Sequence, residues 1–169
     1  MKLLATLKPE DIESNVPEFD YSIFTPRAAG RAIVFDQERV ALIHVTKHDY
    51  YMLPGGGIKN EDIHAGLIRE IREELGCEIT ITAEVGKVEV YFDRWKKKQT
   101  DFCFMANKVI STNAGTPTEF EISEGHKIIW ANNILEAMQL IEKAQPLHRD
   151  GKLVRARDLL FLKSAYSYL

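Results

Sequence analysis

The stretch 53-LPGGGIKNEDIHAGLIREIREELGC-77 decides how the rest of the chain is interpreted. Three consecutive glycines follow Pro54, which is typical of a turn whose backbone approaches a neighbouring segment closely. Asp62 is a good N-cap residue and Gly76 a good C-cap residue, so the spacing predicts a helix between them. The stretch therefore predicts a short strand, a glycine turn and a helix, in that order.

The predicted helix carries an apolar stripe and an acidic face. The stripe consists of Ile63, Leu67, Ile68, Ile71 and Leu75. Glu70, Glu73 and Glu74 are three and four residues apart, so they share one face beside the stripe. Like charges at this spacing destabilise a helix by a few tenths of a kcal/mol per pair. Two of them also occupy the last turn, where the helix dipole disfavours negative charge. Such local conflict is typical of a functional site.

A hard divalent cation would remove this repulsion. Mg²⁺ takes oxygen ligands and shares its coordination shell with water and substrate phosphate. A backbone carbonyl of the glycine turn, from Gly55 or Gly56, could add to the carboxylates. Arg69 is adjacent in sequence and could orient a carboxylate. The alternative is a solvated helix face with ion pairs, which is the usual role of a Glu- and Arg-rich helix, but the adjacent glycine turn disfavours it.

Gly66 lies inside the predicted helix, one turn before Glu70. Glycine in a helix interior costs about 0.5–1 kcal/mol relative to alanine. We therefore expect its missing side chain to leave room for a loop or a ligand beside the metal.

The stretch resembles the signature of the Nudix hydrolases, G-x5-E-x7-R-E-U-x-E-E-x-G-U, in which U is an apolar residue. The matching residues are, in order, Gly55, Glu61, Arg69, Glu70, Ile71, Glu73, Glu74, Gly76 and Cys77. Cysteine in the last apolar position is a mild departure. The signature glycine is also the first of its run, whereas family members often have it second. This departure leaves open whether the carbonyl of Gly55 or of Gly56 faces the metal.

The resemblance implies an α+β fold, namely the family's α/β/α sandwich around a mixed β-sheet. We expect a single domain over residues 1–169, with residues 1–25 as an N-terminal extension and residues 144–169 as a C-terminal helical extension. It also implies Mg²⁺-dependent (or Mn²⁺-dependent) hydrolysis of a diphosphate bond in a nucleoside diphosphate linked to another group. Metal-activated water would attack phosphorus, because the bound ion lowers the pKa of the water and neutralises phosphate oxygens.

The resemblance also implies roles for individual residues. The expected metal ligands are Glu70, Glu73 and Glu74, with Arg69 as the orienting arginine and Glu61 as the supporting glutamate. The general base varies among members, and Glu73 is one candidate. Glu121 and Glu124 are the others, because comparable members have a glutamate shortly before a strand such as KIIW. For each of these two, an ordinary solvated loop position is an equal alternative.

The signature does not name the substrate. Members specialised for ADP-ribose commonly carry a proline shortly after the signature, and no proline occurs here between Pro54 and Pro117. A nucleoside triphosphate, including an oxidised one, is our first hypothesis, and another nucleoside diphosphate derivative is the second. A non-catalytic Nudix-like nucleotide-binding domain is the alternative class, which the complete carboxylate set disfavours. An isomerase acting on a diphosphate substrate is a third class, although no cysteine–glutamate pair is evident.

Composition bounds the partners and the compartment. The 169 residues carry a net charge of −3, so we expect no membrane association and no stable nucleic-acid complex. No window reaches the apolar length of a membrane span. Cys77 and Cys103 lack metal-ligand spacing, which predicts a reducing compartment and a cytoplasmic protein. We expect a small-molecule nucleotide as the partner. The sequence does not decide between a monomer and a homodimer.

The remaining segments predict further elements. Apolar and β-branched runs predict strands at 27–36, 39–46, 50–54, 78–92 (one strand, or two broken at Gly86), 100–110 and 127–131. The segment 93–99 predicts a hairpin tip, and the acidic segment 111–126 predicts a loop. Helices are expected at 8–14, at 132–144 with Asn132 or Asn133 as N-cap, and at 153–169 with Leu159, Leu162 and Tyr166 on one face.

Overall fold

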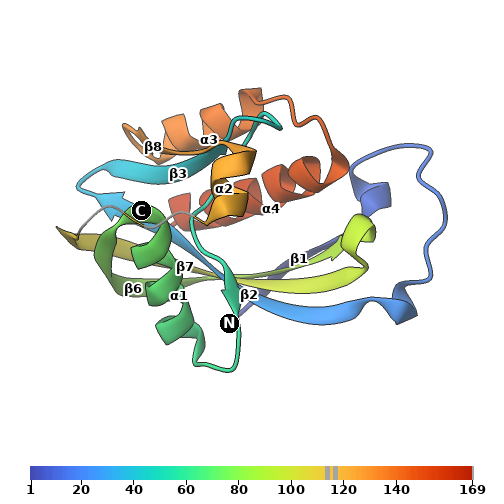
Figure 1. The fold of residues 1–169 in the computed structure, drawn as a ribbon, viewed down its shortest axis with the longest axis horizontal. Coiled ribbons are helices and arrows are strands. Elements are labelled where there is room, and N and C mark those ends of the chain that lie inside the picture. The colour runs from blue at the N-terminus through green and yellow to red at the C-terminus, as the bar shows by residue number, and fades with distance from the viewer. Residues whose placement is uncertain (113–114, 116–117, 169) are drawn as a thin grey trace.

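The computed structural model describes residues 1–112, 115 and 118–168. The strands are β1 (Leu3–Leu7), β2 (Thr25–Asp36), β3 (Arg39–Val45), β4 (Tyr50–Met52), β5 (Gly57–Ile58), β6 (Cys77–Phe92), β7 (Lys97–Ser111) and β8 (His126–Ala131). The helices are α1 (Ile63–Leu75), α2 (Glu119–Glu124), α3 (Ile134–Lys143) and α4 (Arg149–Tyr166), with short 3-10 turns η1 (Pro9–Asp11), η2 (Tyr21–Ile23) and η3 (Asp93–Trp95). Figure 1 shows helices on both sides of the sheet, which confirms the predicted α+β fold with a mixed sheet.

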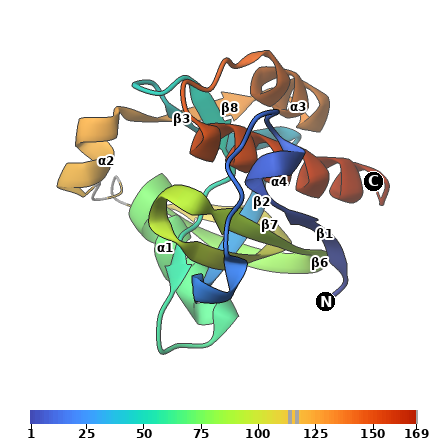
Figure 2. The same cartoon turned by 90° about the vertical axis from the view of Figure 1, so that its right-hand side faces the viewer.

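The sheet has the order β1-β6-β7-β2-β3-β4, with β5 beside β2 and β8 beside β3. β2 runs parallel to β7 over their whole common length, and β6 and β7 form a long antiparallel hairpin. The predicted hairpin of β2 and β3 is confirmed, but its pairing stops after Phe35↔Val40 and Asp36↔Arg39. Beyond that turn β3 diverges from β2 together with β4 and β8. Figure 2 shows α4 in the opening between these two parts of the sheet.

The strand predicted at 78–92 is one continuous element, β6, with an irregular register at Gly86. Gly86 has φ +156°, and a Cβ there would lie 2.7 Å from Cγ of Leu4. The glycine therefore gives β1 room to pack on β6, and the two strands pair in parallel from Leu3↔Lys87 to Leu7↔Val90. The N-terminal segment thus contributes an edge strand to the sheet.

The predicted loop at 111–126 is wrong in part, because it contains α2. Thr118 and Glu121 form a capping box, in which the Thr118 hydroxyl accepts from the Glu121 N–H at 3.2 Å and the Glu121 carboxylate accepts from the Thr118 N–H at 2.7 Å. Gly125, with φ +72°, ends the helix. The part of the predicted loop at 113–114 and 116–117 lies outside the described residues.

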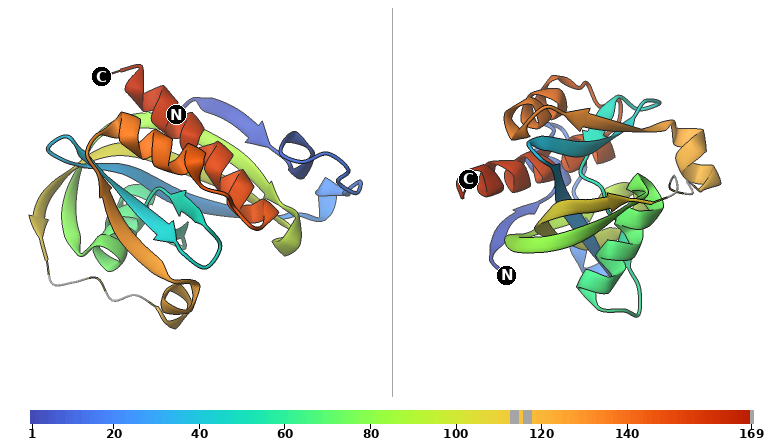
Figure 3. Two further views of the ribbon diagram at one scale, coloured as in Figure 1. Left: turned by 90° about the horizontal axis from the view of Figure 1, so that it is seen from above. Right: turned by 90° about the vertical axis from the view of Figure 1, so that its left-hand side faces the viewer.

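Two apolar clusters fill the two faces of the sheet. On one face, Leu67 and Ile71 of α1 are fully buried against Ala32, Val34 and Phe104 of the sheet, which confirms the predicted stripe. On the other face, α3 and α4 cover the sheet. Figure 3 shows the same arrangement from two further directions. None of the described helices is long and apolar enough to cross a lipid bilayer.

The predicted buried face of the C-terminal helix is correct in part. Leu162 is buried and Leu159 packs against the core as expected, but Tyr166 is 48% exposed. Phe161 and Ala165 are fully buried instead, together with two charged side chains, Arg157 and Asp158. The apolar spacing missed this face because the charged pair, rather than an apolar residue, continues it toward the sheet.

We expect the substitution Phe161→Ala to lower the free energy of unfolding by about 3–5 kcal/mol, because it leaves a cavity in the core beneath α4. Tyr166→Ala, on the same helix, is the matched control and should lower it by less than about 1 kcal/mol. Urea denaturation followed by circular dichroism measures both. Equal small losses would show that α4 does not contribute to the cooperative core.

Candidate active site

The glycine turn between β4 and β5 is fixed along β2. The carbonyl of Pro54 accepts from the N–H of Ala32 at 3.0 Å, and the carbonyl of Gly56 accepts from the N–H of Gly30 at 2.9 Å. Gly55 has φ +127°, and a Cβ there would lie 2.2 Å from the carbonyl oxygen of Gly30. Only glycine allows the turn to lie this close to the strand.

This turn holds two of the predicted metal ligands. A Cβ at Gly56 would lie 2.0 Å from Oε2 of Glu70, so the bare backbone makes room for that carboxylate. The N–H of Gly55 donates to Oε2 of Glu74 at 2.7 Å. The turn and α1 therefore bring Glu70 and Glu74 to the same place, as the sequence predicts. This connection explains why the glycines and the acidic helix occur next to each other in the chain.

Arg69 provides a positive charge within the acidic face. Its guanidinium donates to Glu61 (Nη2 to Oε1, 2.7 Å), to Glu70 (Nη1 to Oε1, 2.8 Å) and to Glu73 (Nη1 to Oε2, 3.2 Å). The hydrogen bond with Glu61, followed by the one with Glu70, raises the pKa of Arg69, and Arg69 in turn lowers the pKa of Glu61. Arg69 therefore offsets part of the carboxylate repulsion, and Glu61 ties the end of the turn to the helix.

Gly66 makes room for this tie. A Cβ at Gly66 would lie 2.7 Å from Cδ1 of Ile58 and 3.1 Å from Cδ of Glu61. The space that the glycine leaves is filled by the loop that carries Glu61. We expected the missing side chain of Gly66 to leave room for a loop or for a ligand. The described contacts are with the loop.

Glu74 is the most deeply placed of the acidic residues. Burial raises its pKa to about 7, while the Gly55 N–H and the positive charge of Arg31 act in the opposite direction. The negative charges of Glu121 and Glu70 raise it further. Too little positive charge lies near this carboxylate to balance it when it is ionised. A bound cation would supply that charge.

The donor set fits a hard divalent cation, but the ligands are not assembled in this conformation. Within the described part of the chain, no group of three or more His, Cys, Asp or Glu side chains is arranged to hold a metal ion. Glu70 and Glu74 lie at the glycine turn, whereas Glu73 is held by Arg69 with its side chain 54% exposed. All three offer the oxygen ligands that Mg²⁺ and Mn²⁺ prefer. A rotamer change at Glu73 would be needed to bring the third carboxylate in.

The carbonyls expected to face the metal already have partners. The Gly55 carbonyl accepts from Nη1 of Arg31 at 2.5 Å, and the Gly56 carbonyl accepts from β2. A carbonyl oxygen has two lone pairs, so each retains one acceptor position. Which of the two serves an ion stays a prediction.

The two glutamates proposed as general bases lie in different places. Glu121 lines a cavity of about 540 Å³ together with Glu74 and His126. Glu124, on the same short helix, points elsewhere and pairs with Lys47 at 2.8 Å and with His48 at 2.6 Å. The hydrogen bond from Lys47 lowers the pKa of Glu124. The structure therefore brings Glu121, and not Glu124, to the acidic face of α1.

A buried network of charged side chains supports the turn from beneath, and the sequence interpretation missed it. Asp101 of β7 accepts from Nε of Arg31 at 3.0 Å, from Nη1 of Arg157 at 3.1 Å, and from Nε2 of Gln99. Arg157 also pairs with Asp158 at 2.7 Å. All five side chains are almost fully buried. Although burial opposes it, the charges of Arg157 and Arg31 keep the pKa of Asp101 low.

This network reaches the glycine turn at two points. Arg31 donates to the Gly55 carbonyl, and Asp158 of α4 accepts from the N–H of Leu53 at 2.8 Å. The segment just before α1 is therefore held by β2 and by the C-terminal helix together. The available signal in the sequence was the presence of charged residues inside otherwise apolar runs, at Arg31, Asp101 and Arg157.

Comparisons with known proteins identify relatives in fold. The family model of the NUDIX domain matches residues 25–148. No match was found among curated proteins. A Nudix hydrolase from Nitrosomonas europaea superposes with a TM-score of 0.61 at 15% identity, covering 85% of this chain and 90% of that chain. The MutT protein of Methanosarcina mazei Go1 gives 0.58 at 16% identity and covers 85% and 96%, respectively. A structure described as a UDP-X diphosphatase gives 0.57 at 15% identity and covers 95% and 70%.

We expect Arg157→Met to lower the free energy of unfolding by about 3–5 kcal/mol, because it leaves Asp101 and Asp158 buried without this partner. Arg155→Met, two residues away on α4, is the matched control, since Arg155 donates to the Ala144 carbonyl and not to a carboxylate of the network. Guanidinium denaturation measures both. If the two variants were equally stable, the network would not be a source of stability.

We expect Gly66→Leu to reduce turnover more than stability, because the new side chain would displace Ile58 and Glu61 and so loosen Arg69. Ala65→Leu is the control, because residue 65 is exposed on the same helix. Steady-state kinetics and thermal unfolding of both variants test this. Parallel losses of turnover and of melting temperature in Gly66→Leu would contradict it.

Proposed function

Because the chain belongs to the Nudix hydrolase family, we propose that it hydrolyses a diphosphate bond in a nucleoside diphosphate linked to another group, with Mg²⁺ or Mn²⁺ at Glu70, Glu73 and Glu74. The observation that carries this proposal is the glycine turn, which places Glu70 and Glu74 together through Gly56 and the Gly55 N–H. A surface helix stabilised by ion pairs would not need a glycine turn that makes room for Glu70 and donates a hydrogen bond to Glu74.

Each residue of the site has a task in this proposal. When bound, the ion neutralises phosphate oxygens and lowers the pKa of the attacking water. Arg69 orients Glu70 and Glu73 by charge-assisted hydrogen bonds, and Glu61 fixes Arg69 in turn. The Gly55 N–H holds one oxygen of Glu74 and leaves the other available.

Glu121 is the better supported of the two distant candidates for the general base. It shares a cavity with Glu74, and after burial its negative charge is a further, smaller cause of the raised pKa of Glu74. Glu124 is committed to Lys47 and His48. Glu73 is the alternative base, because its carboxylate is the most exposed of the three on α1.

For the substrate, we propose a nucleoside triphosphate first, including an oxidised one, and another nucleoside diphosphate derivative second. Structures of this fold include the UDP-X diphosphatase and an ADP-ribose pyrophosphatase from Streptococcus suis, which superposes with a TM-score of 0.53 at 17% identity. These likenesses support the reaction class through the fold and do not select a substrate. We also propose a cytoplasmic location, supported by the free and buried thiols of Cys77 and Cys103.

The direct test is a panel of nucleoside triphosphates, oxidised nucleotides and diphosphate conjugates with Mg²⁺ or Mn²⁺. We expect the wild type to turn over at least one compound, and Glu73→Gln and Glu74→Gln to reduce kcat by at least about 100-fold, since the ion supplies several kcal/mol of transition-state stabilisation. Glu78→Gln is the matched control, because Glu78 pairs with Arg72 just beyond the same helix. Phosphate release and product chromatography measure the rate and the bond that is cut.

Two outcomes would overturn parts of this proposal. Turnover unchanged in Glu73→Gln and in Glu74→Gln would reject the assigned ligands. A wild type that binds Mn²⁺ and nucleotides but turns over none of the panel would favour the non-catalytic nucleotide-binding alternative. Mn²⁺ binding, measured by water-proton relaxation, distinguishes a variant that no longer binds the metal from one that binds it but no longer hydrolyses the substrate.

A further inference from the structure

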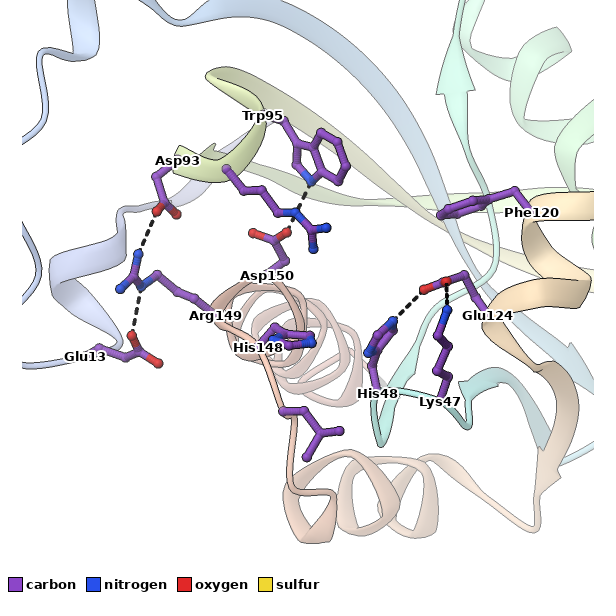
Figure 4. Close-up of a pocket in the computed structure, with 12 residues that line it drawn as sticks. Glu13, Lys47, His48, Asp93, Trp95, Phe120, Glu124, His148, Arg149 and Asp150 are labelled. Carbon is purple, nitrogen blue, oxygen red and sulfur yellow. Dashed lines mark hydrogen bonds and ion pairs between the residues drawn. The ribbon is translucent and has the colours of Figure 1, made fainter.

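A second cavity of about 630 Å³ lies on the other side of α2 from the cavity that contains Glu74. Figure 4 shows it between segments that are distant in sequence: the tip of the β6–β7 hairpin, the turn between β3 and β4, the helix α2 and the beginning of α4, with Glu13 of the N-terminal segment at its edge. None of its lining residues belongs to the Nudix signature, and the reaction as proposed above uses none of them except the disfavoured candidate Glu124.

Two exposed aromatic rings border this cavity. The side chain of Trp95, at the hairpin tip, is 57% exposed, and that of Phe120, on α2, is 66% exposed. Figure 4 shows both rings facing the same open space from different elements. Large aromatic side chains that stay exposed around a concave surface are typical of a ligand site, because they offer flat faces on which a planar ring can stack.

The polar groups between the rings are arranged for an uncharged ligand. The indole N–H of Trp95 donates to Oδ2 of Asp150 at 3.1 Å, which holds the ring in place. Asp93 gives one oxygen to Arg149 at 2.6 Å, whereas its Oδ1 is buried without a hydrogen-bond partner, as is Nδ1 of His48. Buried polar atoms normally have partners, and both of these residues line the cavity.

The charge of the cavity argues against phosphate as its ligand. The four lining carboxylates outnumber the three Lys and Arg side chains. Arg149 is already paired with Glu13 and Asp93, and Lys47 with Glu124. The third cation, Arg94, lies over one face of the Trp95 ring, 4.7 Å from its centroid, which leaves the other face for a ligand. A phosphate would therefore meet excess negative charge, whereas a neutral heterocycle with N–H groups would meet hydrogen-bond acceptors. Burial also raises the pKa of Asp150, which reduces the cost of covering it with a ligand.

The strands β2 and β7 connect this cavity with the glycine turn. The guanidinium of Arg27 lies beside Gly57 and donates to Oε1 of Gln99 at 2.9 Å. Gln99 is four residues from Trp95 along the chain, so the paired strands β2 and β7 run from the glycine turn to the hairpin tip that carries the aromatic ring. A molecule with a diphosphate at the turn can therefore extend along these strands toward the cavity.

We propose that this cavity binds the nucleobase of the substrate, stacked against Trp95 and Phe120 with its N–H groups directed toward Asp150. The inference rests on the proposed function for the position of the phosphates, but not for the recognition of the base itself. It makes Trp95, Phe120 and Asp150 determinants of specificity rather than catalytic residues.

The test uses nucleosides without phosphate, so that binding depends on neither metal nor turnover. In a Trp130→Phe background Trp95 is the sole tryptophan, and its fluorescence reports the cavity. We expect saturable quenching by at least one of adenosine, guanosine, cytidine and uridine, and none by ribose. Phe120→Ala should weaken that nucleoside at least about fivefold, because stacking contributes on the order of 1 kcal/mol or more per base.

The matched control is Ile122→Ala, because Ile122 lies on the same helix and is 65% exposed but does not line the cavity. It should leave the nucleoside affinity unchanged. Absence of saturable quenching up to the solubility of all four nucleosides, or equal effects of Phe120→Ala and Ile122→Ala, would overturn the inference. A change of oligomeric state in Phe120→Ala, seen by light scattering without a change in affinity, would also overturn it in favour of a contact between copies.

The outcomes separate this inference from the proposed hydrolysis. Nucleoside binding without turnover of any diphosphate compound would support the cavity and reject the enzyme. Turnover with a KM that Trp95→Ala and Phe120→Ala leave unchanged would support the enzyme and reject the cavity. If the hydrolysis and the base-binding cavity are both correct, Trp95→Ala should raise KM at least about fivefold and lower kcat much less, since the base is remote from the reacting phosphorus.

Discussion

The rest of the site depends on the hydrogen bonds that the buried guanidinium of Arg31 makes. It reaches the Gly55 carbonyl with one nitrogen and the Asp101 carboxylate with another. A cation in the core needs a carboxylate partner, because leaving either charge unpaired costs several kcal/mol. Asp101 is shared with Arg157, and Arg157 is balanced by Asp158. The position of the glycine turn is therefore linked to the C-terminal helix, which lies beyond the matched family region at 25–148.

The acidic face of α1 shows how the fold offsets an unfavourable local sequence. Glu61, Glu70 and Glu73 converge on Arg69, so a single guanidinium reduces the repulsion among three carboxylates. The same arrangement keeps Glu73 near the protein surface and away from Glu74. Binding of a cation would thus compete with Arg69 for Glu73, while the glycine turn keeps the other two ligands in place.

Features set by neighbouring residues in the chain could be predicted, and features set by distant residues could not. The bounds of α1 and its stripe follow from local spacing and were confirmed, and of the two N-caps predicted for α3, Asn132 or Asn133, the structure has Asn133. The helix α2 was also local, since Thr118 and Glu121 have capping-box spacing, but the acidic loop composition hid it. The pairing of β1 with β6, and the meeting of Arg31 with Asp101 and Arg157, depend on strand register across many residues, which the sequence does not specify.

The same difference applies to the residues proposed for the reaction and to those proposed for substrate selection. The signature is one continuous stretch, so the residues that would act on the diphosphate can be recognised from their spacing alone. The cavity with Trp95, Phe120 and Asp150 is assembled from a hairpin tip and two helices that meet only in the folded chain. Asp150 belongs to the same helix that supports the glycine turn through Asp158. A change in the position of α4 would therefore move the wall of this cavity and the glycine turn together, which under the two proposals would couple the choice of substrate to the geometry of the reaction.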